Sequence, residues 1–135
     1  MKLFFVKIVL LTIFVSPAFA TEDDEALMNR LCGACHMSDA KPRIAPPMFG
    51  VINHVKDAYP TKQEFVQRVV SWVQEPKAEN TLMPGAVRRF GLMPKQLVAE
   101  QDLQRIAAHM YERKQVLPDW YKKHYKERHG KDPQE

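Results

Sequence analysis

The chain has 135 residues, enough for one domain and too few for a multidomain enzyme. Its 20 Lys and Arg residues against 16 Asp and Glu give a formal net charge of +4, too small an excess to indicate a nucleic-acid-binding protein. Two cysteines exclude a disulfide-rich scaffold and a four-cysteine zinc module. They leave open a cysteine pair that acts as one chemical unit.

The N-terminal segment, residues 1–20, has the pattern of a secretory signal peptide. Lys2 and Lys7 give it a basic start, residues 8–15 are mostly apolar, and Ala18-Phe19-Ala20 supplies small residues before a cleavage point. The apolar stretch is shorter than the roughly 20 residues of a membrane-spanning helix, and a retained N-terminal anchor is the alternative. We expect cleavage after residue 20, a periplasmic location in a bacterium, and no integral membrane span after cleavage.

The first predicted helix of the mature chain covers residues 22–31 and leads into Cys32. Four acidic residues lie in its first turn, where the helix dipole favours negative charge. Residues 38–60 follow with no helical period, and they contain four prolines and a glycine. We therefore expect an ordered loop in this range.

Two further helices are predicted after this loop. Thr61 and Glu64 form a capping box ahead of apolar residues at helical spacing, and Pro76 stops that helix. Residues 77–98 are a second predicted loop, with two Met-Pro pairs. Residues 100–116 give the clearest helical pattern, with one apolar face.

The expected fold class is all-α, with three to four helices joined by long Pro-rich loops. A charged and aromatic segment follows at residues 119–135, where a further short helix is expected. A few helices joined by long loops bury little apolar surface. A chain this short therefore often needs an additional stabilising cross-link or bound group.

The run Cys32-Gly33-Ala34-Cys35-His36 has the spacing of the motif that attaches haem c. Two thiols separated by two residues at a helix end can both reach the vinyl groups on one porphyrin edge, and the next imidazole can then bind the iron. We therefore predict one haem c attached covalently through Cys32 and Cys35, with His36 as an iron ligand.

Three other interpretations of the cysteine pair have less support in the sequence. A thiol–disulfide redox site calls for a thioredoxin-like βαβ pattern, which the sequence does not show. A zinc site needs two more well-placed ligands, and the remaining histidines are scattered. A structural disulfide between residues three apart closes almost no loop.

On these residues the chain resembles class I c-type cytochromes, which are small monohaem electron carriers. The resemblance covers most of residues 22–112 and rests on the helix before CGACH, on APPMFGV, on the helix ending WVQEP, and on GLMPKQLVAEQDLQRIAAHM. It implies a cytochrome c-like fold wrapped round one haem at residues 21–117, with the tail at 118–135. It also implies that the carbonyl of Pro46 accepts a hydrogen bond from the second ring nitrogen of His36, which orients the ring.

The resemblance implies a methionine followed by proline as the distal iron ligand. Met93 lies seven residues before the last predicted helix, whereas Met83 would leave an unusually long loop, so we favour Met93 with Met83 as the alternative. The other internal methionines, Met28, Met37, Met48 and Met110, are expected to pack in the core or against the haem. His54 and His109 are weaker alternatives, because a lone histidine is more often a surface or hydrogen-bonded residue.

The sequence also departs from the family pattern around the first and last helices. Many members have Gly eight residues before the first cysteine and an aromatic residue four before it, where this chain has Asp24 and Met28. The usual aromatic residue of the last helix is replaced by His109, with Tyr111 close by. These positions bear on how the two helices cross.

A haem with His and Met ligands has no open coordination position, so the resemblance implies a carrier of single electrons between redox partner proteins and not an enzyme. No acid/base pair or nucleophile constellation is evident elsewhere. The alternatives are a haem subunit of a larger periplasmic oxidoreductase and a gas or redox sensor with a labile distal methionine.

The C-terminal tail has two interpretations. Residues 112–135 hold seven Lys or Arg and five acidic residues, and Trp120, Tyr121 and Tyr125 are interleaved with the basic ones. We favour an extra helix that packs its aromatic residues on the domain. The alternative is a docking element for an acidic partner or a membrane surface.

Overall fold

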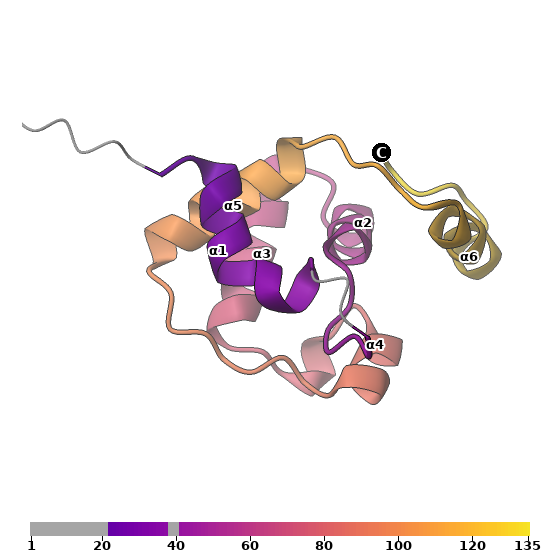
Figure 1. The fold of residues 1–135 in the computed structure, drawn as a ribbon, viewed down its shortest axis with the longest axis horizontal. Helices are drawn as coiled ribbons and strands as arrows, with labels where there is room; N and C mark the ends of the chain where they lie inside the picture. Colours follow the sequence, from indigo (N-terminus) through magenta and orange to yellow (C-terminus); the bar gives the residue numbers. More distant parts are fainter. Residues whose placement is uncertain (1–21, 38–40) are drawn as a thin grey trace, which may run out of the picture.

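Six α-helices and one short 3-10 turn, joined by loops, make up the part of the chain that the computed structural model describes, residues 22–37 and 41–135 (Figure 1). The helices are α1 (Asp24–His36), α2 (Met48–Ala58), α3 (Lys62–Gln74), α4 (Pro84–Phe90), α5 (Glu100–Glu112) and α6 (Asp119–His129), and the 3-10 turn is Ala78–Asn80. The all-α prediction is confirmed for these residues. Among them, no helix combines the length and apolarity needed to cross a membrane. The predicted signal peptide lies outside the described residues.

Helices α1 and α3 begin where side chains cap their free backbone N–H groups. The Asp23 carboxylate accepts a hydrogen bond from the backbone N–H of Ala26 at 2.7 Å and so caps α1. Thr61 and Glu64 form the predicted capping box of α3. Helix α1 continues five residues beyond the expected limit of residue 31, so the whole CGACH run is helical.

Two helices occur where loops were predicted, and the expected count of three to four helices is therefore wrong. Residues 48–58 form α2 and residues 84–90 form α4. Their prolines lie at helix starts: Pro47 is the N-cap of α2, and Pro84 is the first residue of α4. A proline is tolerated there because the first N–H groups of a helix have no intrahelical acceptor.

The last predicted core helix is shorter than expected. Helix α5 ends at Glu112, and Arg113 already has extended backbone angles. The chain then runs outward, with Val116 almost fully exposed and Leu117 buried beside α6. Packing on α6 therefore outweighs the helical pattern that continues to residue 116.

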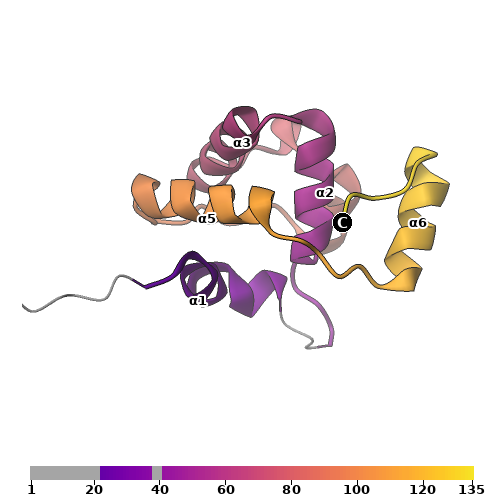
Figure 2. The same ribbon diagram turned by 90° about the horizontal axis from the view of Figure 1, so that it is seen from above.

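The main core lies between α1, α2, α3 and α5. Helix α5 packs against α1 on one side and α3 on the other, and α2 contacts both α3 and α5 (Figures 1 and 2). The core residues are Leu27, Met28, Met48, Ile52, Val55, Phe65, Val69, Ile106, Ala107 and Met110. At the crossing of α1 and α5, Arg105 pairs with Asp24 at 2.7 Å.

Helix α6 lies on the far side of α2, away from α1, α3 and α5 (Figure 2). It forms a second apolar cluster in which Leu117, Tyr121 and Tyr125 are buried and Phe49 of α2 packs against them. The segment after α6 returns to α2, where the backbone N–H of Gln134 donates to Asn53 Oδ1 at 2.7 Å. The tail therefore packs on the domain through its aromatic residues, and α2 is covered on both sides.

A group of polar and aromatic side chains holds the end of α6 on α2. The Tyr125 hydroxyl and Lys131 Nζ both donate to the Asp57 carboxylate. The His129 ring stacks on Tyr125 at a centroid distance of 4.2 Å and lies 5.1 Å from the His54 ring. Burial, the nearby His54 and Lys131, and His124 lower the pKa of His129 below its ordinary value of 6.5, against an opposing effect of Asp57.

We predict that mild acid weakens the packing of α6 on α2. Because the pKa of His129 is lowered in the folded state, the undocked tail binds a proton more readily than the docked one. The docking free energy is therefore full above pH 6.5 and declines as the pH falls from there through the lowered pKa. Trp120 fluorescence or near-UV circular dichroism between pH 7.5 and 5 measures this change.

The matched control is His129→Gln, which should remove the pH dependence in this range. The pKa of Asp57 is lowered from 3.8, so its contribution is lost only in stronger acid. An unchanged acid transition in His129→Gln would contradict the assignment to His129.

Candidate functional site

The last two turns of α1 carry the complete cysteine–histidine motif. Cys35 lies three residues and His36 four residues after Cys32, so a helical backbone places all three side chains on one side of α1. Helix α1 ends directly after the motif, where the Met37 N–H bonds to the Gly33 carbonyl at 3.0 Å. The end of this helix therefore presents two thiols and an imidazole together.

The two thiols are free and have different surroundings. Cys32 is half-buried and packs against the main core, whereas Cys35 is exposed. Burial, with a smaller effect of the neighbouring Cys35, raises the pKa of the Cys32 thiol. At neutral pH Cys32 is therefore held as a thiol.

The His36 ring is oriented by one hydrogen bond. Its Nδ1 lies 2.8 Å from the Pro46 carbonyl oxygen, in the loop just before α2. A carbonyl can only accept, so Nδ1 carries the proton and donates it. In the neutral ring Nε2 then keeps its lone pair and is the nitrogen available to a metal.

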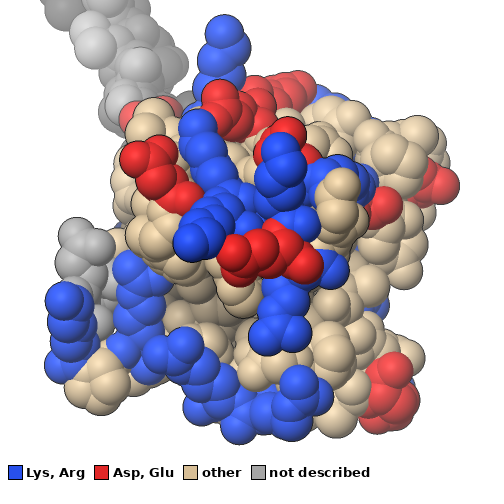
Figure 3. Space-filling model, turned by 90° about the vertical axis from the view of Figure 1, so that its right-hand side faces the viewer, with Lys and Arg blue, Asp and Glu red and all other residues tan. Residues whose placement is uncertain are grey.

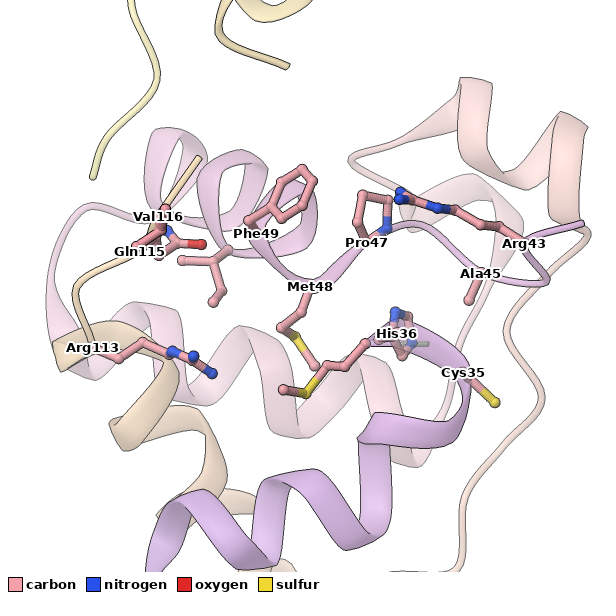
Figure 4. Close-up of a pocket in the computed structure, with 12 residues that line it drawn as sticks. Cys35, His36, Arg43, Ala45, Pro47, Met48, Phe49, Arg113, Gln115 and Val116 are labelled. Carbon is pink, nitrogen blue, oxygen red and sulfur yellow. The ribbon is translucent and has the colours of Figure 1, made fainter. Parts of the chain in front are cut away.

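A cavity of about 220 Å³ lies beside this motif, between the end of α1, the start of α2 and the segment after α5 (Figure 4). Its lining residues are Cys35, His36, Met37, Arg43, Ala45, Pro47, Met48, Phe49, Ile52, Arg113, Gln115 and Val116. In Figure 4 the Met48 side chain extends from the start of α2 toward the end of α1, while the Cys35 sulfur points away from Met48 and Phe49. The wall of this cavity is of mixed character, with apolar side chains beside His36, two arginines and the buried Gln115.

The two candidate distal ligands lie at opposite ends of α4. Met83 is the N-cap of α4, and its methyl carbon would lie 3.9 Å from a Cβ added to Gly50, so it packs toward α2. Met93 is half-buried and follows Gly91, whose φ of +83° and extended ψ form a conformation open almost only to glycine. Neither methionine lines the cavity beside His36.

The other methionines are placed as packing residues. Met28, Met48 and Met110 are buried in the main core, and Met37 packs against it while lining the cavity.

The two alternative histidines have different environments. His54 Nδ1 lies 2.8 Å from the Gly50 carbonyl within α2, and its ring faces α6. His109 Nε2 is buried, and no hydrogen-bond partner for it occurs within the described residues. Residues 22–37 and 41–135 bring together no group of three or more His, Cys, Asp or Glu side chains able to hold a metal ion.

Sequence reasoning missed the residues of α2 that face α6 and the residues after α5 that line the cavity. Phe49, Asn53 and Asp57 follow one another at intervals of four and face α6, a helical signal hidden in the range taken for a loop. Arg113 and Gln115 enter the cavity wall only because α5 ends early.

Three comparisons with known proteins complete the description of this all-α chain and its cysteine–histidine motif. The chain is 28% identical over 120 residues to an uncharacterized protein of Aquifex aeolicus (strain VF5), covering 74% of this chain and 77% of the relative. No protein-family model matches the chain. No solved structure matches it either.

We predict that iodoacetamide modifies Cys35 before Cys32 in the protein without any cofactor. The thiolate is the reacting form, and Cys35 is exposed while burial raises the pKa of Cys32. Cys35 should react faster than Cys32 at pH 8, and the two rates should become similar in denaturant. Mass spectrometry of the modified peptides at increasing times measures both rates, and faster modification of Cys32 in the folded protein would contradict these surroundings.

Proposed function

We propose that this protein is a monohaem c-type cytochrome that carries single electrons between redox partners in the periplasm. Haem c is attached through Cys32 and Cys35, with His36 as the proximal and Met93 as the distal ligand. The observation that carries the proposal is the geometry of the His36 ring at the end of the CGACH helix. The 2.8 Å hydrogen bond from Nδ1 to the Pro46 carbonyl leaves Nε2 free to bind iron.

The side chains proposed to hold haem c have the chemistry that this group requires. Imidazole nitrogen and methionine sulfur are both good ligands for haem iron, and two free thiols on one side of a helix suit two thioether bonds. When bound, the haem supplies one-electron redox chemistry. The chain attaches it through the thiols, orients its ligand through Pro46, and offers an apolar surface of Met and Phe residues near the motif.

The arrangement of the helices supports a cytochrome c-like fold. Helices α1 and α5, the counterparts of the family's first and last helices, pack against each other. The departures from the family pattern lie at this crossing. Asp24 pairs with Arg105, and Met28 is fully buried and accepts a weak contact from Arg113 at 3.7 Å.

The contact of Met83 with α2 supports Met93 as the distal ligand. A Cβ added to Gly50 would lie 3.9 Å from the Met83 methyl carbon, so Met83 packs toward the start of α2. Met93 lies half-buried on the loop between α4 and α5.

We predict that Met93→Ala abolishes the absorption band of methionine sulfur on ferric iron, whereas Met83→Ala keeps it. Both variants should keep the alkaline pyridine spectrum of a haem with two thioether bonds, because Cys32 and Cys35 are unchanged. Optical spectra of the exported protein, oxidised and reduced, measure both properties.

Three outcomes would contradict parts of this proposal. The reverse result in the two methionine variants would assign Met83 as the ligand. Ready binding of carbon monoxide by the unmodified reduced protein would favour the sensor alternative. The absence of a thioether haem spectrum would overturn the proposed function itself.

Within the described residues, Arg88 and Arg89 of α4 and Lys123 and Arg128 of α6 have no ion-pair partner, and the α4 pair is the one closer along the chain to the proposed ligand Met93. Lys122, Lys126 and Lys131 are paired with Glu135, Asp132 and Asp57. Viewed from the α6 side, blue and red side chains mix in the upper part, while the lower edge is mostly blue (Figure 3).

We predict that replacing Arg88 and Arg89 by Gln slows oxidation of the reduced protein by hexacyanoferrate(III), an anionic probe. The rate should fall roughly two- to fivefold at low ionic strength and recover toward the unmodified value in salt, because the effect is electrostatic steering. Stopped-flow absorbance measures it. Replacing Lys123 and Arg128 of α6 by Gln is the matched control. Equal slowing in this control would contradict the preference for α4 and would favour the tail as the docking element.

A further inference from the structure

We propose that the C-terminal segment, residues 118–135, is a clamp that holds the start of α2 and thereby the Pro46 carbonyl that orients His36. Asn53 is the positioning residue at its centre. The consequence for the redox centre rests on the proposed function, whereas the clamp itself rests on contacts within the chain.

The face of α2 that meets the tail is continuous along the whole helix. Phe49, Asn53 and Asp57 recur every fourth residue and so form one stripe. At the start, the Phe49 ring meets the Tyr121 ring edge to face at 4.7 Å. At the end, Asp57 accepts hydrogen bonds from the Tyr125 hydroxyl and from Lys131.

Asn53 joins the tail to the first turn of α2. It is completely buried, and its Nδ2 donates to the Phe49 carbonyl at 3.0 Å. Its Oδ1 accepts from the backbone N–H of Gln134 at 2.7 Å. A buried side chain amide with both ends bonded fixes the two backbones it connects, since breaking either bond leaves a buried polar group unsatisfied.

The acceptor of the His36 hydrogen bond lies directly before the first turn of α2. The Gly50 and Val51 N–H groups bond to the Pro47 carbonyl, and Pro46 immediately precedes this turn. No side chain caps the start of α2. The position of the Pro46 carbonyl therefore depends on how firmly the body of α2 is held, and the tail holds the side that the main core does not reach.

The redox consequence follows from the hydrogen bond itself. Donation from Nδ1 makes the imidazole a more basic ligand and favours ferric iron. Loosening the clamp lets the Pro46 carbonyl move and weakens that donation. The reduced state is then favoured, without any change at a ligand.

The decisive experiment compares two clamp variants with two controls in the full chain. Asn53→Ala removes the central link, and Tyr125→Phe removes only the hydroxyl bond to Asp57 while keeping the ring. Val70→Ala deletes buried carbons in α3, outside the clamp, and Lys123→Ala changes an exposed residue of α6. The readouts are unfolding in urea, the midpoint potential, and solvent exchange of the His36 Nδ1 proton by NMR.

We expect both clamp variants to raise the ratio of reduced to oxidised protein at a fixed mediator potential, by roughly three- to tenfold for Asn53→Ala and less for Tyr125→Phe. Exchange of the His36 Nδ1 proton should speed up in the same order. Val70→Ala should lower stability without moving either readout, and Lys123→Ala should move none of the three.

Clamp variants that lose stability but leave the potential and the proton exchange unchanged would overturn the proposal. So would Val70→Ala shifting both readouts as much as Asn53→Ala. If the pyridine spectrum shows no thioether haem, the proposed function fails, yet proton exchange at His36 in the cofactor-free protein still decides the clamp. Tyr125→Phe keeps the test valid if Asn53→Ala does not fold.

Discussion

The hydrogen bond between His36 and Pro46 is the interaction on which the proposed redox centre depends, and two packing interfaces fix its two ends. The donor belongs to α1, which lies on α5 through a buried methionine and an ion pair between Asp24 and Arg105. The acceptor belongs to the loop that starts α2. Because α2 is packed on both sides, neither end of this bond can shift without disturbing a buried cluster.

Local signals predict the helices that have their own caps. The capping box at Thr61 and Glu64 sets the start of α3, and the acidic first turn before Cys32 indicates α1. Helices α2 and α4 are not predicted because a proline has two possible meanings. Proline breaks a helix when it lies in the interior, but it is common at the start of a helix, where these two helices have it. The early end of α5 depends on Leu117 finding its place beside α6, a tertiary contact that no local pattern encodes.

The candidate site likewise contains residues that the sequence predicts and residues that it does not. Cys32, Cys35 and His36 are read from their spacing alone, since one helix end places all three. The role of Pro46 comes from a resemblance, and the structure supplies the distance. Asn53, Gln115 and Arg113 cannot be predicted from residue spacing, because the residues around them come from other segments of the chain. No protein-family model matches the chain, so its proposed function rests on the chemistry of the cysteine–histidine motif.

The sequence separation of these contacts has a consequence for biosynthesis. His36 and Pro46 are ten residues apart, whereas Lys131 reaches Asp57 across 74 residues and Gln134 reaches Asn53 across 81. Close contacts cost little chain entropy and form early, while distant ones wait for the last residues to be synthesised. During folding, the motif and its acceptor can therefore come together before the tail closes over α2. The two thiols can then be modified first, and the histidine is held firmly once the tail has docked.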